Sequence, residues 1–176
     1  MTVTNATRLI ARAAVLAAVA FSAALLVGCG NSPEKDFQKG KDAQEKGRYD
    51  EAVKYYEKAA DKDHDEAMFQ LGMLYYGGKG VEEDQELGTI YLEGAAEAGN
   101  AKAQFFVLTL DPAFQFMSDE QAKIKMKPIE EGLLKLAEAG DTEAMALYGS
   151  ICLTYGDLAE AQKWAKKVEE LDKKKK

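Results

Sequence analysis

Small residues recur at a fixed spacing between residues 67 and 103, and this pattern constrains the fold more than any other feature. The stretch opens at Ala67, continues through a Leu71-Gly72 pair, and gives way to a second alanine-led segment at Ala103, 36 residues after Ala67. A glycine-rich turn at 78–80 separates two segments with helical spacing. A period of this length is typical of stacked helix-pair repeats, in which small residues occupy the positions where helices cross.

The pattern of this stretch resembles the Sel-one-like repeat, a relative of the tetratricopeptide repeat with a longer turn. The matching positions are Ala67, Leu71, Gly72, Tyr75, Gly78, Gly80, Val81, Asp84, Tyr91, Ala95, Ala96 and Gly99. The one departure is Gly88, where alanine is usual, and it predicts a second helix softened by roughly 1 kcal/mol relative to alanine. Gly78 and Gly80 are expected to adopt positive φ in the turn, and Asp84 to cap the next helix.

Three looser units flank this one. The first and the fourth resemble tetratricopeptide repeats, with small residues where helices cross and an aromatic residue to fill the gap, and Trp164 of the fourth is expected to pack between helices. His64, Asn100 and Asp141 fall at the same place in successive units, where a new helix starts. The only histidine is therefore interpreted as a helix cap and not as a ligand or a base.

The third unit departs most from the pattern. Ser118 and Gln121 form a capping box, which predicts a helix that Pro128 must break or kink. The unit is also rich in large apolar side chains, which are Phe105, Phe106, Phe114, Phe116 and Met117. Two interpretations stay open at this stage: core filling in an irregular repeat, or an exposed apolar patch for a partner.

The first thirty residues read as a secretory signal. Arg8 and Arg12 precede an apolar run over residues 13–27, which is short for a membrane span. The run ends in Leu26-Val27-Gly28-Cys29, which resembles the lipobox of bacterial lipoproteins. The resemblance implies cleavage after residue 28 and acylation of Cys29, for example with palmitate. Because no aspartate follows Cys29, it further implies an outer-membrane lipoprotein facing the periplasm. An uncleaved anchor helix is the alternative.

The predicted organisation is therefore a signal peptide with lipobox (1–28), a lipidated cysteine and tether (29–36), a helical-repeat domain (37–171) and a lysine tail (172–176). The expected fold class is all-α, an α-α superhelix of about four helix-turn-helix repeats.

Few patterns in this sequence point to catalysis or to binding of a metal, cofactor or nucleic acid. The formal net charge of −7 argues against nucleic-acid binding, which needs clustered basic residues to neutralise phosphates. No zinc, phosphate-loop, nucleophile-elbow or dinucleotide motif occurs, so we expect no catalytic residue, metal or cofactor. Cys152 lies between Ile151 and Leu153 and is interpreted as a buried small hydrophobe.

The function expected from this shape is a membrane-anchored scaffold that binds a protein or peptide in the cell envelope. Phe69, Met73 and Tyr76 share a helical face outside the repeat signature, and with Phe106 they are the predicted partner-binding residues. Two alternatives are a structural envelope protein that contacts peptidoglycan, with the lysine tail involved, and a hydrolase using Cys152 and His64.

Overall fold

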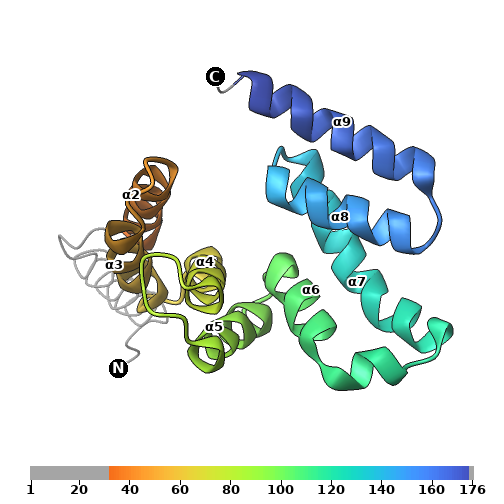
Figure 1. The fold of residues 1–176 in the computed structure, drawn as a ribbon, viewed down its shortest axis with the longest axis horizontal. Helices are drawn as coiled ribbons and strands as arrows, with labels where there is room; N and C mark the ends of the chain where they lie inside the picture. The colour runs from red at the N-terminus through yellow and green to blue at the C-terminus, as the bar shows by residue number, and fades with distance from the viewer. Residues whose placement is uncertain (1–31, 175–176) are drawn as a thin grey trace, which may run out of the picture. The chain divides into compact units, whose positions relative to one another are not determined.

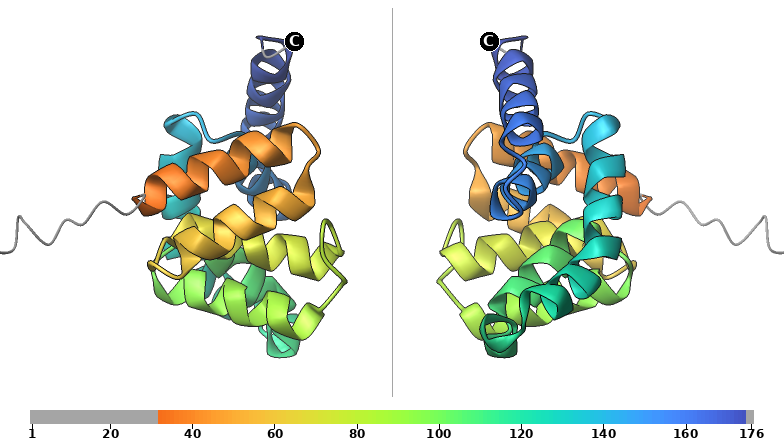
Figure 2. Two further views of the ribbon diagram at one scale, coloured as in Figure 1. Left: turned by 90° about the vertical axis from the view of Figure 1, so that its left-hand side faces the viewer. Right: turned by 90° about the vertical axis from the view of Figure 1, so that its right-hand side faces the viewer.

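The structure is a computed structural model that describes residues 32–174, and within this range it is purely helical (Figures 1 and 2). In chain order the elements are α2 (Pro33–Glu45), α3 (Tyr49–Ala60), α4 (Asp65–Gly77), α5 (Gln85–Glu97), α6 (Ala101–Leu110), the 3-10 helix η1 (Pro112–Phe116), α7 (Asp119–Glu138), α8 (Thr142–Thr154) and α9 (Leu158–Lys174). The α-helices form four hairpin pairs, which are α2 with α3, α4 with α5, α6 with α7 and α8 with α9, and we number them first to fourth. Their stacking gives the predicted α-α superhelix. The predicted signal peptide and Cys29 lie outside the described residues.

None of the described helices combines the length and the apolar composition needed to cross a membrane.

The starts of the helices follow the expected capping residues. The side chains of His64, Asn100 and Asp141 accept the backbone N–H of the residue three positions later, at the starts of α4, α6 and α8. Asp84 caps α5 in the same way, and Ser118 and Gln121 form both bonds of a capping box at α7. These bonds satisfy amide groups that the helix itself cannot pair, so nearby residues in the sequence determine where these helices begin.

Two glycines let α4 and α5 approach closely. A β-carbon placed at Gly88 would lie 2.9 Å from the backbone nitrogen of Tyr76 and 3.0 Å from the carbonyl oxygen of Gly72. A β-carbon at Gly72 would in turn meet Leu92 at 2.7 Å and the carbonyl oxygen of Gly88 at 3.0 Å. The interpretation of Gly88 as a soft spot is therefore incomplete, because alanine cannot be accommodated at this crossing without a shift of backbone.

Of the two outcomes expected at Pro128, a break or a kink, the structure contradicts the break. Helix α7 is continuous over Asp119–Glu138, with Pro128 inside it. Proline removes the hydrogen bond to the carbonyl group four residues earlier, which belongs to Ile124. Ile124 is 66% exposed and Pro128 is exposed as well, so water can reach the carbonyl group that loses its partner.

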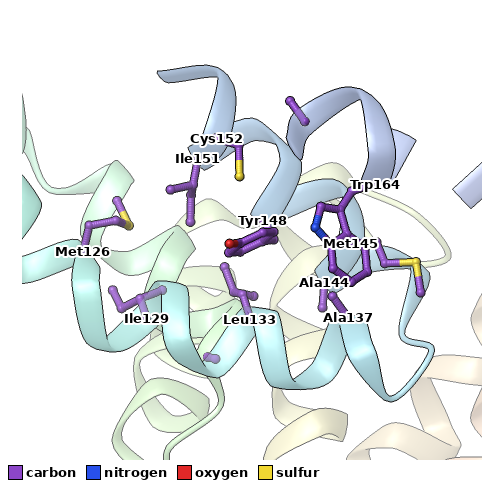
Figure 3. Close-up of a cluster of buried hydrophobic side chains, with 12 residues drawn as sticks. Met126, Ile129, Leu133, Ala137, Ala144, Met145, Tyr148, Ile151, Cys152 and Trp164 are labelled. Carbon is purple, nitrogen blue, oxygen red and sulfur yellow. The ribbon is translucent and has the colours of Figure 1, made fainter. Parts of the chain in front are cut away.

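Three hydrophobic clusters hold the pairs together. The first joins α2, α3 and α4, the second joins α4, α5 and α6, and the third lies mainly among α7, α8 and α9. Figure 3 shows the third cluster, in which Tyr148 of α8 lies among the side chains of α7. Trp164 packs edge-on against Tyr148 with ring centroids 5.8 Å apart, and Cys152 is 6% exposed. The predictions of a packed Trp164 and a buried Cys152 are thus confirmed.

The aromatic residues of the third pair divide between the two interpretations. Phe105 and Phe114 are partly buried against the third cluster, and Phe106 against the second. Phe116, at the end of η1, is 89% exposed. Core filling therefore accounts for most of these rings, and only Phe116 projects fully into solvent.

Candidate partner-binding site

Of the residues predicted to bind a partner, Phe69 lies instead at the interface between the second and third pairs. Phe69 is completely buried, with the ring of Phe106 at 5.8 Å and the ammonium group of Lys102 at 5.0 Å. Met73 and Phe106 are half-buried in the same cluster. Tyr76 is half-buried at the end of α4 beside Gly88. Partner binding by Met73, Tyr76 and Phe106 therefore stays a prediction.

This burial contradicts the expected exposure of Phe69, which cannot contact a partner in this arrangement. The prediction assumed that a face without signature residues points into the groove. In the structure that face of α4 packs against α6, because α4 contacts the first helix of the next pair as well as its own partner, α5.

A different cavity opens where the first helices of all four pairs converge. Its volume is about 400 Å³, and we call it the inner pocket. It is lined by Phe37, Lys41, Gln44, Glu45, Tyr56, Glu66, Gln70, Lys102, Gly140, Asp141, Thr142 and Glu143. These residues come from α2, α3, α4, α6 and the start of α8. Figure 1 shows α2, α4, α6 and α8 following one another along the stack.

Lys102 forms the floor of the inner pocket. Its side chain is 2% exposed, and its ammonium group pairs with Glu66 at 2.5 Å, Asp141 at 3.0 Å and Glu143 at 3.3 Å. These contacts link the second, third and fourth pairs through one cation. A buried ammonium group is tolerated only with such partners, because removing it from water costs roughly several kcal/mol even after the protein relaxes.

Burial and neighbouring charges shift the pKa values of the groups in this cluster. Burial alone would lower the pKa of Lys102, but the charges of Glu66 and Glu143 outweigh it and raise the pKa above its ordinary range. Burial raises the pKa of Glu143; Lys102 opposes this shift, while the nearby charges of Glu66 and Asp141 add to it. The pKa of Asp141 is lowered despite burial, because the Ala144 amide donates a hydrogen bond to it and Lys102 lies close.

An amide network continues from this cluster towards the first pair. The Nε2 group of Gln70 donates to Glu66 at 3.2 Å and to Glu143 at 3.3 Å. The hydroxyl group of Tyr56 donates to Gln44 at 2.8 Å, and Gln44 donates to Gln70 at 3.5 Å. One connected set of polar side chains therefore reaches from α2 to α8.

Sequence reasoning missed Lys102, although two signals could have found it. Lys102 is the only charged residue of α6, in an otherwise apolar and polar-neutral segment. Its separations from Glu66 and Glu143 are 36 and 41 residues, which match the spacing between successive units. The three side chains thus occupy equivalent positions near the starts of α4, α6 and α8, and stacking brings equivalent positions together.

The remaining candidates do not form a chemical site. Cys152 lies in the third cluster, and burial raises the pKa of its thiol, which disfavours the nucleophilic thiolate. His64 caps α4, stacks on Phe37 with centroids 4.6 Å apart, and contacts Glu34 at 3.1 Å. Among residues 32–174, no group of His, Cys, Asp and Glu side chains is placed to hold a metal ion.

A second cavity, of about 500 Å³, lies beside η1 and the start of α7. Its apolar lining includes Phe105, Phe114, Met126, Ile151 and Tyr155.

Comparisons with known proteins agree with the division into pairs. The Sel1 repeat family matches residues 65–100, and the tetratricopeptide repeat family matches residues 37–61 and 142–175. These matches confirm the resemblances expected for the first, second and fourth units. Repeats of both kinds generally mediate protein–protein interactions, so the chain has the architecture of a protein-binding scaffold.

Two solved structures are similar to this chain. One is a Sel1 repeat protein from Oxalobacter formigenes, with 28% identity and a TM-score of 0.49 over 80% of this chain and 59% of that one. The other is c5321, a protective antigen present in uropathogenic Escherichia coli strains that displays an SLR fold, with 24% identity and a TM-score of 0.47 over 78% of this chain. The chain spans 59% and 30% of the lengths of these two proteins.

Proposed function

We propose that this chain is a lipid-anchored scaffold of the bacterial cell envelope that binds a protein or peptide partner at the inner pocket. The observation that carries the proposal is the convergence of residues from all four helix pairs on one open, polar cavity. Such a surface is assembled only by the stacked repeat, and most of its polar lining residues, such as Lys41, Gln44 and Gln70, are outside the hydrophobic clusters that hold the pairs together. A scaffold needs this separation between residues that specify shape and residues that specify the partner.

Site-specific photocrosslinking in intact cells tests the binding surface. Lys41 lines the inner pocket and is exposed, whereas Ile90 is 57% exposed on α5 and does not line the pocket. A photoreactive amino acid at position 41 should give a partner adduct, and the same group at position 90 should not. Adducts at position 90 only would place partner binding elsewhere. Adducts at neither position would contradict partner binding at the inner pocket.

The anchor rests on the lipobox-like sequence that ends in Cys29. Two or more acyl chains on one cysteine would hold a soluble domain stably at a membrane, whereas one chain gives marginal binding. Metabolic labelling with an alkyne fatty acid should mark the chain, and Cys29→Ala should abolish the label and release the chain from the membrane fraction. Retention of label in Cys29→Ala would contradict the anchor. Fractionation on a density gradient would then separate outer-membrane from inner-membrane location.

A further inference from the structure

We infer that the inner pocket takes a lysine or arginine side chain of the bound partner, seated beside Glu143 and Glu66. This assignment rests on the scaffold function proposed above and adds the chemistry of the partner to it. It follows from the charge balance, the free hydrogen-bonding capacity and the polarity of the pocket.

The lining of the inner pocket carries more negative than positive charge. Four carboxylates line it, those of Glu45, Glu66, Asp141 and Glu143, against the ammonium groups of Lys41 and Lys102. Lys41 is exposed, so solvent screens it, whereas Lys102 is buried at the floor. Around Lys102 three carboxylates face a single cation, which leaves an excess of negative charge in a partly desolvated cavity.

Lys102 cannot satisfy these carboxylates by itself. An ammonium group has three N–H donors, and Lys102 contacts one oxygen each of Glu66, Asp141 and Glu143. The hydrogen bonds to the Glu143 side chain from Gln70 and Lys102 both go to Oε2. Oε1 of Glu143 accepts no hydrogen bond from the part of the chain that the structure describes, so it remains available to an added donor.

The raised pKa of Glu143 agrees with a place for a second cation beside its free oxygen. Burial and the neighbouring charges of Glu66 and Asp141 raise its pKa although Lys102 is in contact. A cation placed at Oε1 would favour the charged form of Glu143 and so oppose this rise in its pKa. A charge-assisted hydrogen bond to a carboxylate is about twice as strong as a neutral one, and a guanidinium group can bind a carboxylate through two parallel bonds.

The pocket is poorly suited to the other classes of side chain. The rings of Phe37 and Tyr56 line it but are 7% and 1% exposed, so an apolar side chain would find little apolar surface to cover. A carboxylate would be repelled by the excess negative charge. The amides of Gln44 and Gln70 also line the pocket, where Gln44 donates one hydrogen bond to Gln70.

Isothermal titration of the full-length chain in detergent with short synthetic peptides tests the assignment. The probe is an acetylated, amidated peptide of alanine and serine with one central arginine. Its matched control carries citrulline, which has the shape of arginine without the charge, and a third peptide carries lysine. The arginine and lysine peptides should bind at least about tenfold more tightly than the citrulline peptide, and raising the salt concentration should weaken their binding.

Two variants locate the seat on the protein. Glu143→Gln and Glu45→Gln should each weaken binding of the arginine peptide, by about tenfold and a few-fold respectively, because the first charge is the more desolvated. Glu93→Gln, on the outer surface of α5, is the matched control and should bind as the parent does. Unchanged circular dichroism of each variant keeps a loss of binding separate from a loss of folding.

Equal affinity for arginine and citrulline, or equal affinity of Glu143→Gln and the parent, would overturn the assignment. These failures differ from a failure of the scaffold. A crosslink at position 41 with no preference for arginine keeps the scaffold and removes only the cationic partner.

Discussion

Gly88 and Gly94 lie in the same helix, α5, yet alanine at these two positions should change stability in opposite directions. Alanine in place of glycine inside a helix stabilises it by about 0.5–1 kcal/mol through backbone conformational entropy alone. At Gly94 the added β-carbon would meet only the sulfur of Met68, at 3.7 Å, which is an ordinary contact. Gly94→Ala should therefore raise the free energy of unfolding by about 1 kcal/mol.

At Gly88 the same gain is outweighed by packing. The obstacles at 2.9 and 3.0 Å are backbone atoms of Tyr76 and Gly72, which cannot move aside by a change of rotamer. Overpacking of this kind costs typically about 1–3 kcal/mol, so Gly88→Ala should lower the free energy of unfolding by up to about 2 kcal/mol after the helix gain is subtracted. The two variants should thus differ by about 1–3 kcal/mol.

Urea denaturation followed by circular dichroism measures both variants against the parent. Because the two substitutions add the same methyl group to one helix, effects on the unfolded chain nearly cancel in the comparison. The helical signal of folded Gly88→Ala should match the parent before denaturation. Stabilisation by Gly88→Ala equal to that of Gly94→Ala would refute the close crossing of α4 and α5.

Three further outcomes are expected. Lys102→Met should lower the free energy of unfolding at neutral pH by about 3–5 kcal/mol, because it leaves three carboxylates without their shared cation; a loss below about 1 kcal/mol in urea denaturation would contradict this. Asp141→Asn keeps an oxygen that can cap α8 but removes the charge, and should cost about 1 kcal/mol at neutral pH. Because the pKa of Asp141 is lowered in the folded state, this contribution is present above about pH 3.9 and is lost as the pH falls through the folded value, so stability curves of variant and parent should converge in acid. In a chain carrying Cys29→Ala, the thiol of Cys152 should react with Ellman's reagent at least about a hundredfold more slowly in the folded than in the urea-unfolded protein; equal rates would contradict its burial.

The helix pairs were predictable because their signals are local. A capping side chain bonds an amide three residues away, and a glycine turn acts within its own loop, so His64, Asn100 and Asp141 marked the repeat boundaries without any knowledge of the fold. The spacing of small residues fixed where helices cross. Pro128 shows the limit of local rules, because a proline within an exposed face of a long helix does not stop it.

The candidate site was harder to predict, because exposure is not a local property in a stack of helices. Phe69 and Met73 lie on a helical face that could have lined the groove or the next pair, and the sequence of α4 alone does not distinguish the two. Only the rotation between successive pairs decides which face stays open. In this chain it directs Phe69 into the second hydrophobic cluster and leaves Glu66 and Gln70 beside the inner pocket.

The sequence by itself therefore determined a stack of helix pairs, their boundaries and a lipobox-like N-terminal segment, since each of these is encoded in short-range spacing. The tertiary structure decided which side chains meet. Glu66, Lys102 and Glu143 are separated by 36 and 41 residues, and they converge because stacking superimposes equivalent positions of successive repeats. It also decided that Gly88 is required at a crossing, since the atoms that exclude a methyl group there belong to a neighbouring helix.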